Sequence, residues 1–373
     1  MGIQVYEKAL ACLRLLCPAF FLLAAQSVNA DDGSGDAILI GNYELGRGLP
    51  IGDSGFTVGG YATARYDDMR GSNPRLTADH LSLMVWWEGS GRWKFFSEAD
   101  LEESLATRHS GADEERFLAL ERFYLDYALT DSVNVRLGKY LTPIGRWNQI
   151  HADPLVWTTS RPMVTHAVFP GTATGGMVQG TVSIGSREMD YAIFLSAGTE
   201  LRRKPAEDPF SEARGLHLNL PVGSALQLGL SLADFEQEAT PGQRKRLAGM
   251  DFLWSRQRWE ITGEGVYRSS NEGAALVEKG GFIQAVAPLT GRLYAVGRIE
   301  ALRFAGADKT SRNWVAGLNY RYNRALSLKA EVVRGSHLQD GMPEGFLASF
   351  NVLIFDPEAT LALEVAVAPV RPA

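Results

Sequence analysis

The chain has 373 residues, a formal net charge of −6 and an ordinary apolar content of 45%. An acidic balance gives no support to nucleic-acid binding, which usually leaves a basic footprint. The length allows either one large domain or two smaller ones.

Residues 1–30 have the pattern of a secretory signal peptide. Basic residues come first, residues 15–25 form an apolar stretch too short to span a bilayer, and cleavage is expected after Ala30. Cys12 and Cys17 leave with this segment, so the exported chain has no disulfide to stabilise it. No later stretch has the roughly 18 consecutive apolar residues that a transmembrane helix needs, so any membrane crossing must use strands.

The next part, 31–55, is a lead-in without a sustained pattern, and the following region, 56–355, alternates apolar and polar residues with the period of a strand. Most of its segments approach the roughly 9 to 11 residues that a tilted strand needs to cross a bilayer. The sixteen predicted strands are 56–66, 79–88, 92–104, 116–129, 133–141, 175–185, 189–198, 213–220, 225–236, 247–254, 258–268, 279–287, 291–303, 313–321, 325–335 and 346–355.

The connections alternate strictly between short turns and longer loops. Short turns on one rim and longer loops on the other are typical of a bacterial outer-membrane barrel, with the short side in the periplasm. The segments therefore predict an all-β fold, a transmembrane antiparallel β-barrel of about 16 strands, with 16 to 18 allowed. The longer loops begin near 67, 105, 142, 199, 237, 269, 304 and 336.

In such a barrel, the apolar residues of each strand face lipid and the alternating polar residues face the lumen, but a few positions do not fit this pattern. Glu121, Lys139 and Gln284 fall on the predicted lipid face, which indicates a register shift at a bulge or a position at the rim. At the end of the chain, 360–368 alternates like a seventeenth strand, so we interpret 356–373 as a periplasmic tail or an accessory strand.

One connection is much longer than the others. The strand 133–141 is followed by residues 142–174, which have no period and are interrupted by four prolines. A structureless connection of this length inside a compact domain indicates a functional loop.

The segment that leads into this loop, LGKYLTPIGRW at 137–147, resembles the phosphate-selective porin O/P type of Gram-negative bacteria. This resemblance implies a barrel of 16 or slightly more strands in the outer membrane, often a trimer, with the third loop folded into the lumen as a constriction. The chain departs from the phosphate-specific members because it has no ladder of inward lysines and arginines, and because strand 92–104 is acidic.

A barrel of about sixteen strands encloses more space than its side chains fill, which leaves a water-filled channel. A loop inside that channel would face the inner wall, and acidic and basic groups on facing sides would set up a transverse field acting on ions and dipolar solutes. The predicted constriction consists of Glu98, Asp100, Glu102, Arg122, Asp126 and Arg136 on the wall and Arg146, Asp153 and Arg161 on the loop, with His151 and His166 nearby.

These patterns predict a porin, a passive diffusion channel for small hydrophilic solutes or ions. The expected partners are outer-membrane lipid, lipopolysaccharide and the solutes, with a possible homotrimer and no nucleic acid. No motif for a catalytic nucleophile, a cofactor or a metal site is found, so we expect no enzyme and no cofactor. Two alternatives stay open: an outer-membrane barrel enzyme of the lipase or protease type, and a secreted soluble all-β binding protein.

Overall fold

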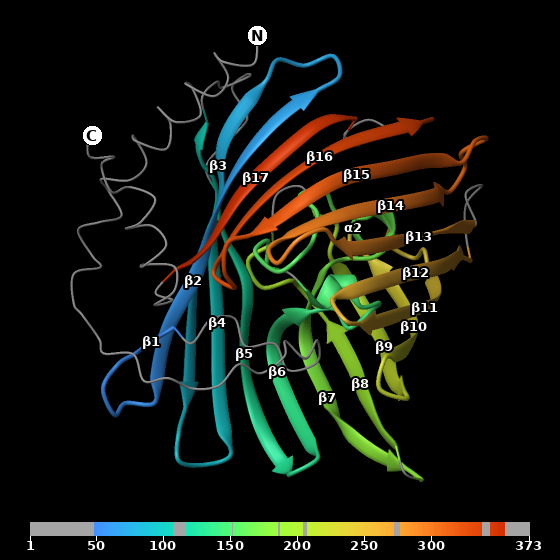
Figure 1. Ribbon diagram of the computed structural model, residues 1–373. Coiled ribbons are helices and arrows are strands. Elements are labelled where there is room, and N and C mark those ends of the chain that lie inside the picture. The colour runs from blue at the N-terminus through green and yellow to red at the C-terminus, as the bar shows by residue number, and fades with distance from the viewer. Residues whose placement is uncertain are drawn as a thin grey trace, which may run out of the picture.

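The computed structural model describes residues 48–106, 117–150, 152–185, 187–203, 207–271, 277–337 and 344–354. Sixteen strands, β2 to β17, form a closed antiparallel barrel (Figure 1). A short extra strand, β1 (Leu49–Pro50), pairs with β2 through Val58 and Thr57. Within the described residues, no helix has the length and apolar character needed to cross a membrane.

The barrel strands are 9 to 14 residues long, and two short helices lie in the connection between β6 and β7. The strands are β2 (Phe56–Met69), β3 (Arg75–Glu88), β4 (Trp93–Ala106), β5 (Phe117–Thr130), β6 (Val133–Leu141), β7 (Thr172–Ile184), β8 (Arg187–Ala197), β9 (Phe210–Val222), β10 (Leu226–Gln237), β11 (Lys245–Arg256), β12 (Trp259–Ser270), β13 (Val277–Pro288), β14 (Leu293–Arg303), β15 (Ser311–Arg321), β16 (Leu326–Ser336) and β17 (Gly345–Ile354); the helices are η1 (Trp147–Gln149) and α2 (Met163–Ala167).

The barrel closes where the last strand meets the first. β17 pairs with β2 from Gly345 opposite Met69 to Ile354 opposite Gly60, and each other strand pairs with its neighbours in the chain. The sixteen predicted strands are confirmed, because each corresponds to one strand of the barrel. The predicted signal peptide 1–30 and the tail 356–373 lie outside the described residues, as does the lead-in before residue 48.

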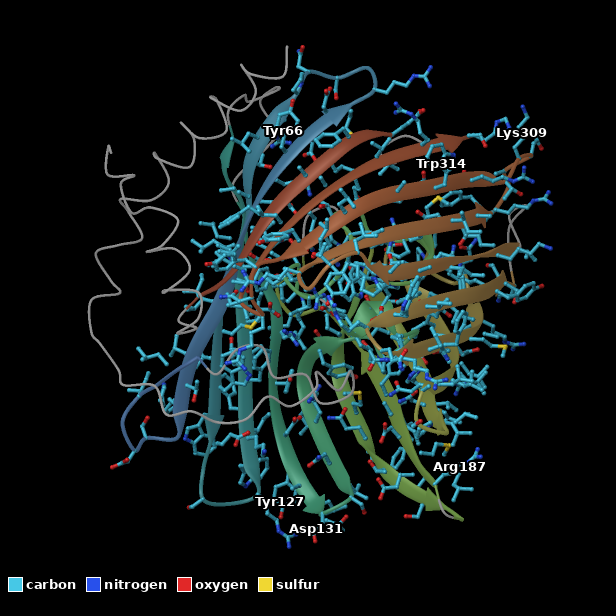
Figure 2. The ribbon with its side chains drawn as sticks, in the orientation of Figure 1. Tyr66, Tyr127, Asp131, Arg187, Lys309 and Trp314 are labelled. Carbon is cyan, nitrogen blue, oxygen red and sulfur yellow. The ribbon has the colours of Figure 1, made fainter. Side chains whose placement is uncertain are left out.

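The outer face of the wall is apolar. Leu137 and Ile299 are 57% and 64% exposed, whereas the polar residues that alternate with such positions point inward and are largely buried. An unbroken exposed apolar belt is what lipid contact requires. Figure 2 shows Tyr127 near the rim that carries Asp131, and Tyr66 and Trp314 toward the opposite end, where interfacial aromatics are expected.

The three exceptional positions have three different explanations. In β5, Arg122 pairs with Glu98 and Leu120 with Ala99, so the buried Glu121 between them is the extra residue of a bulge.

Gln284 is a correction to the predicted register. It faces the lumen beside Phe282 and Val286, which are all buried, while the intervening Ile283 is 50% exposed. The sequence pattern was misleading here because the inner wall of β13 is itself apolar.

Lys139 does face outward, close to the end of β6. It pairs across the ladders with Phe123 and Thr174, and its ammonium group lies 3.1 Å from the Glu200 carboxylate. It also donates to the backbone oxygen of Leu201 at 3.2 Å, so the connection after β8 covers this charge.

Candidate functional site

The connection 142–171, called the lumen loop here, starts and ends at neighbouring points of the wall. Thr142 N donates to Gly171 O at 2.9 Å. The Asn148 side-chain amide donates to Thr142 O at 2.8 Å and to Gly171 O at 2.9 Å. These bonds fix the base of the loop between β6 and β7, and the remaining loop lies inside the barrel (Figure 1).

One side of the lumen is filled by apolar packing. The loop supplies a buried apolar face that includes both of its short helices, and β6 to β14 supply inward apolar residues. This cluster excludes water from that side and stabilises the folded loop. Its buried members are Tyr140, Ile144, Trp147, Val156, Met163, Val164, Val168, Phe169, Ala173, Met177, Phe194, Phe210, Ala213, Ala233, Phe235, Leu247, Val266, Phe282 and Leu302.

The first polar anchor of the loop is Glu264 on β12. Its Oε1 accepts from the backbone N–H groups of Arg146 at 2.8 Å and Trp147 at 2.5 Å. Gly145 precedes them with a φ of +65°, and a Cβ at this position would lie 2.4 Å from Glu264 Oε2. This turn therefore requires glycine, both for its left-handed backbone and for the space beside the carboxylate.

The second anchor holds the middle of the loop against β14 and β16. The Arg298 guanidinium donates to Thr158 Oγ1 at 2.8 Å and to Ser160 O at 2.9 Å. On β16, the Glu331 carboxylate accepts from Thr159 N at 3.0 Å and from Ser160 N at 2.7 Å. Charge-assisted bonds of this kind to buried backbone groups are stronger than neutral ones, so the loop is held in one position.

Substitution of Glu331 by alanine is expected to loosen this anchor. The N–H groups of Thr159 and Ser160 would lose their acceptors, at a cost of about 1–3 kcal/mol each. Hydrogen–deuterium exchange in the loop should then be about tenfold faster or more. Glu331→Gln keeps only one of the two acceptor oxygens, so its effect should be intermediate. Equal exchange in Glu331→Ala and the wild type would show that this carboxylate does not hold the loop.

Charged side chains line the other side of the lumen, on β2 to β6. Arg122 Nε lies 2.6 Å from Glu98 Oε2, and Arg136 makes a two-pronged contact with Asp126 at 2.7 and 2.8 Å. The Arg136 guanidinium also stacks over the Tyr124 ring, 3.6 Å from its centroid. We call β2 to β6, with their inward charges, the charged wall.

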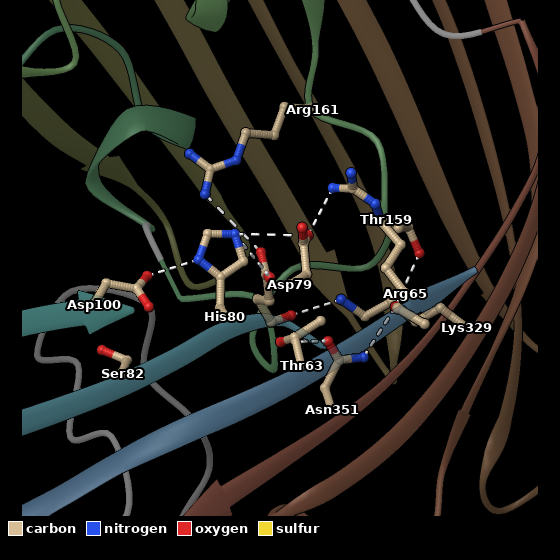
Figure 3. A network of polar contacts seen from close by, with 12 residues as sticks. Thr63, Arg65, Asp79, His80, Ser82, Asp100, Thr159, Arg161, Lys329 and Asn351 are labelled. Carbon is tan, nitrogen blue, oxygen red and sulfur yellow. Dashed lines mark hydrogen bonds and ion pairs between the residues drawn. The ribbon is translucent and has the colours of Figure 1, made fainter. Parts of the chain in front are cut away.

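The part of the charged wall nearest the lumen loop is a network around His80 (Figure 3). Arg65 contacts Asp67 at 3.0 Å and Asp79 at 2.6 Å, and His80 Nδ1 lies 2.6 Å from Asp100 Oδ2. The loop contributes Arg161 and Asp153, whose charged groups are 3.9 Å apart. Asp153 O in turn accepts from Lys329 at 2.6 Å, which ties this point of the loop to β16.

The structure therefore brings most of the residues predicted for the constriction to one region. Glu98, Asp100, Arg122, Asp126 and Arg136 lie on the charged wall, with Asp153 and Arg161 of the loop beside its β2–β3 end. The side chains of Glu102 and His166 lie outside the part of the structure that is described, as does His151 as a whole.

Arg146 lies elsewhere, against the opposite wall. Its guanidinium contacts Asn219 at 3.4 Å and Gln227, and it is 3.8 Å from Asp251. Burial lowers the pKa of Arg146 below its ordinary value, while Asp251 and Glu264 act in the opposite direction. Its role is therefore to anchor the loop rather than to face the charged wall.

The sequence analysis expected acidic and basic groups on opposite sides of the channel, but the structure arranges these charges differently. Glu98 and Arg122 sit on neighbouring strands of the same wall, and so do Asp126 and Arg136. Opposite charges thus pair along the wall, which weakens any field across the lumen. Sequence reasoning missed Arg65. It also assumed that neighbouring residues of a strand face opposite sides, and under that assumption Asp79 and His80 cannot both face the lumen.

No family model matches the chain. An uncharacterised protein of Aquifex aeolicus (strain VF5) is 30% identical over 120 residues, which are 32% of this chain and 27% of that protein. The match thus spans about a quarter of the length of that relative.

Solved structures of outer-membrane barrels match far more of the chain. OmpT of Vibrio cholerae covers 82% of it with 99% of its own chain, at 9% identity and a TM-score of 0.56. The anion-selective porin of Comamonas acidovorans covers 80% with 98% of its own chain, at 13% identity and a TM-score of 0.53. The outer-membrane channel DcaP of Acinetobacter baumannii covers 81% with 98% of its own chain, at 11% identity and a TM-score of 0.53. The chain therefore shares the porin barrel fold.

Proposed function

We propose that this chain is an outer-membrane porin, a passive diffusion channel for small hydrophilic solutes or ions that is narrowed by the lumen loop. One observation carries the proposal: charged side chains inside the barrel remain in contact with solvent. The side chains of Arg65 and Arg161 are 31% and 36% exposed, although both point into the lumen. A barrel packed solid would have buried apolar groups there, so the charged wall is best explained as the side of a water-filled path.

The charge of this path favours cations. Away from the rims, the described inward residues of the charged wall and of the loop beside it carry six carboxylates, five guanidinium groups and one imidazole. A surplus of fixed negative charge in a narrow pore attracts cations and repels anions. The carboxylates are Asp67, Asp79, Glu98, Asp100, Asp126 and Asp153, and the guanidinium groups are Arg65, Arg75, Arg122, Arg136 and Arg161.

The same charges limit what the likeness to the phosphate-selective porin O/P type implies. We propose that the chain shares the architecture of that type, with the third loop as a constriction. We do not propose that it shares the selectivity for phosphate. The sequence pattern further supports a signal peptide at 1–30, a barrel over 56–355 and a periplasmic tail or accessory strand at 356–373. We propose that the mature chain lies in the outer membrane in contact with lipid and lipopolysaccharide and has no enzymatic activity.

We include a homotrimer in this proposal. One of the similar solved structures, the in-vitro folded OmpT of Vibrio cholerae, is described as a trimer form. Crosslinking of the detergent-solubilised chain, followed by gel electrophoresis, should give a three-chain species. A single-chain species alone would remove this part of the proposal.

Solute permeation distinguishes this function from the alternatives. Liposomes containing the folded chain should swell in sugars at rates that fall steeply with sugar size. Heat-modifiable migration on a gel shows beforehand that the barrel is folded. A folded barrel that admits no sugar would favour a filled barrel enzyme, and a chain that stays monomeric in water without detergent would favour a soluble binding protein.

A further inference from the structure

A histidine in the network of the charged wall is oriented like a metal ligand. His80 Nδ1 is held by Asp100 Oδ2 at 2.6 Å, which leaves Nε2 pointing at two other carboxylates. The distances are 3.7 Å from Nε2 to Asp79 Oδ2 and 3.8 Å to Asp153 Oδ2. Both are too long for hydrogen bonds. They are slightly longer than the separation of two tetrahedral ligand atoms that each lie about 2.0–2.2 Å from a zinc ion, so a small inward shift would let the three atoms share one ion.

The fold brings these three ligands together from two elements. In β3, Ala78 pairs with Ala64, His80 pairs with Thr63, and Asp79 is skipped in both described ladders. This bulge allows two consecutive side chains to point to the same side of the wall, which an even strand would prevent. The lumen loop brings Asp153 from the opposite direction, and the three ligand atoms lie within 4.8 Å of one another.

The neighbouring cations leave the triad available. Arg161 lies nearest Asp153 Oδ1, whereas the oxygen facing His80 is Oδ2. Arg65 does bond Asp79 Oδ2 at 2.6 Å, but a carboxylate oxygen has two lone pairs and accepts a second partner.

The same cluster is rich in buried carboxylates. The carboxylates of Asp67, Asp79, Asp100 and Asp153 surround His80, with the guanidinium groups of Arg65 and Arg161 and the Lys329 ammonium beside them. Among the described residues, Asp67 Oδ1 and Asp100 Oδ1 are buried without a hydrogen-bond partner.

We propose that His80, Asp79 and Asp153 bind one divalent first-row metal ion, such as Zn²⁺, inside the barrel, with Asp100 orienting the imidazole. A nitrogen ligand favours Zn²⁺ and its neighbours over Ca²⁺, which takes six to eight oxygens. A carboxylate on the second ring nitrogen is the usual partner of a metal-binding histidine. The side chains of His80 and Asp153 are both 17% exposed, so an ion can enter from solvent. Binding does not depend on conduction, so this inference stands or fails apart from the proposed function.

The test uses tag-free, EDTA-treated, folded chain in detergent, titrated with Zn²⁺ in competition with a chromogenic chelator. One ion per chain is expected. His80→Ala should weaken binding at least about 100-fold, because a ligand is lost. Asp100→Asn should weaken it about 10- to 100-fold, as loss of an orienting partner does. The control is His217→Ala, a second buried lumen histidine that bonds Ser231 instead, at 2.9 Å, and it should bind as the wild type does.

Asp153→Asn is the second variant, because it changes a loop ligand without altering the strand pairing of β3. It should also bind Zn²⁺ more weakly by at least about tenfold. Each variant is first shown to be folded by heat-modifiable migration. Equal Zn²⁺ affinity in wild type, His80→Ala and Asp153→Asn, or no binding to the wild type at micromolar Zn²⁺, would overturn the proposal.

Discussion

Replacement of Arg298 by alanine is expected to release the middle of the lumen loop and to lower the free energy of unfolding by about 3–5 kcal/mol. The Arg298 guanidinium is fully buried and lies 3.3 Å from Glu300. It also holds Thr158 and Ser160 through three hydrogen bonds of 2.8 to 2.9 Å. Its loss would leave the buried Glu300 carboxylate without this partner, and that is the costly outcome when one member of a buried ion pair is removed.

Two measurements check this prediction. Denaturant unfolding of the barrel in detergent should have a lower midpoint, and chymotrypsin should cleave the loop after Trp157 faster than in the wild type. Arg298→Lys keeps a charge but not the forked donor geometry, so its effect should be intermediate. Arg256→Ala, at an exposed position of the β11–β12 turn, is the control. Unchanged stability and cleavage in Arg298→Ala would show that the loop is held mainly by its apolar cluster.

Neutralisation of Asp67 and Asp153 together is expected to abolish the preference for cations. The double variant Asp67→Asn, Asp153→Asn leaves four carboxylates and five guanidinium groups around the path, so the surplus of negative charge disappears. The measurement is the reversal potential in a KCl gradient across a planar bilayer. EDTA is present so that no divalent ion adds charge beside His80.

The opposite change provides the matched control. Arg65→Ala, Arg161→Ala removes two positive charges from the same network and should increase the preference for cations. The two double variants should therefore shift the reversal potential in opposite directions. If it is the same in both, the ions do not pass the charged wall.

The barrel could be predicted from sequence because lipid on one side and water on the other impose a period of two on every strand. The prediction was wrong for Gln284, because the inner face of β13 is apolar there: Phe282 packs in one cluster with the lumen loop, and Val286 is buried on the same face. Alternation shows that two faces differ. It does not show which one is inside when both are partly apolar.

The candidate site was less accessible to sequence reasoning. Asp79 and His80 share one side only because of a bulge, which the sequence pattern does not reveal, and their partner Asp153 lies more than seventy positions later in a loop without a period. Arg146 was predicted to belong to the constriction because it lies in the loop. In the structure, the turn at Gly145 brings the backbone to Glu264, and the Arg146 side chain lies against the wall opposite the charged wall. Such placements depend on tertiary contacts.

The central claim is that water and ions pass between the lumen loop and the charged wall. Single-channel recording in a planar bilayer tests it most directly, with the wild type compared with a variant in which residues 152–161 are replaced by an equal length of glycine and serine. The account predicts steady conductance steps for the wild type and larger, fluctuating steps for the variant. A folded wild-type barrel that conducts nothing, or a variant whose steps equal those of the wild type, would contradict it.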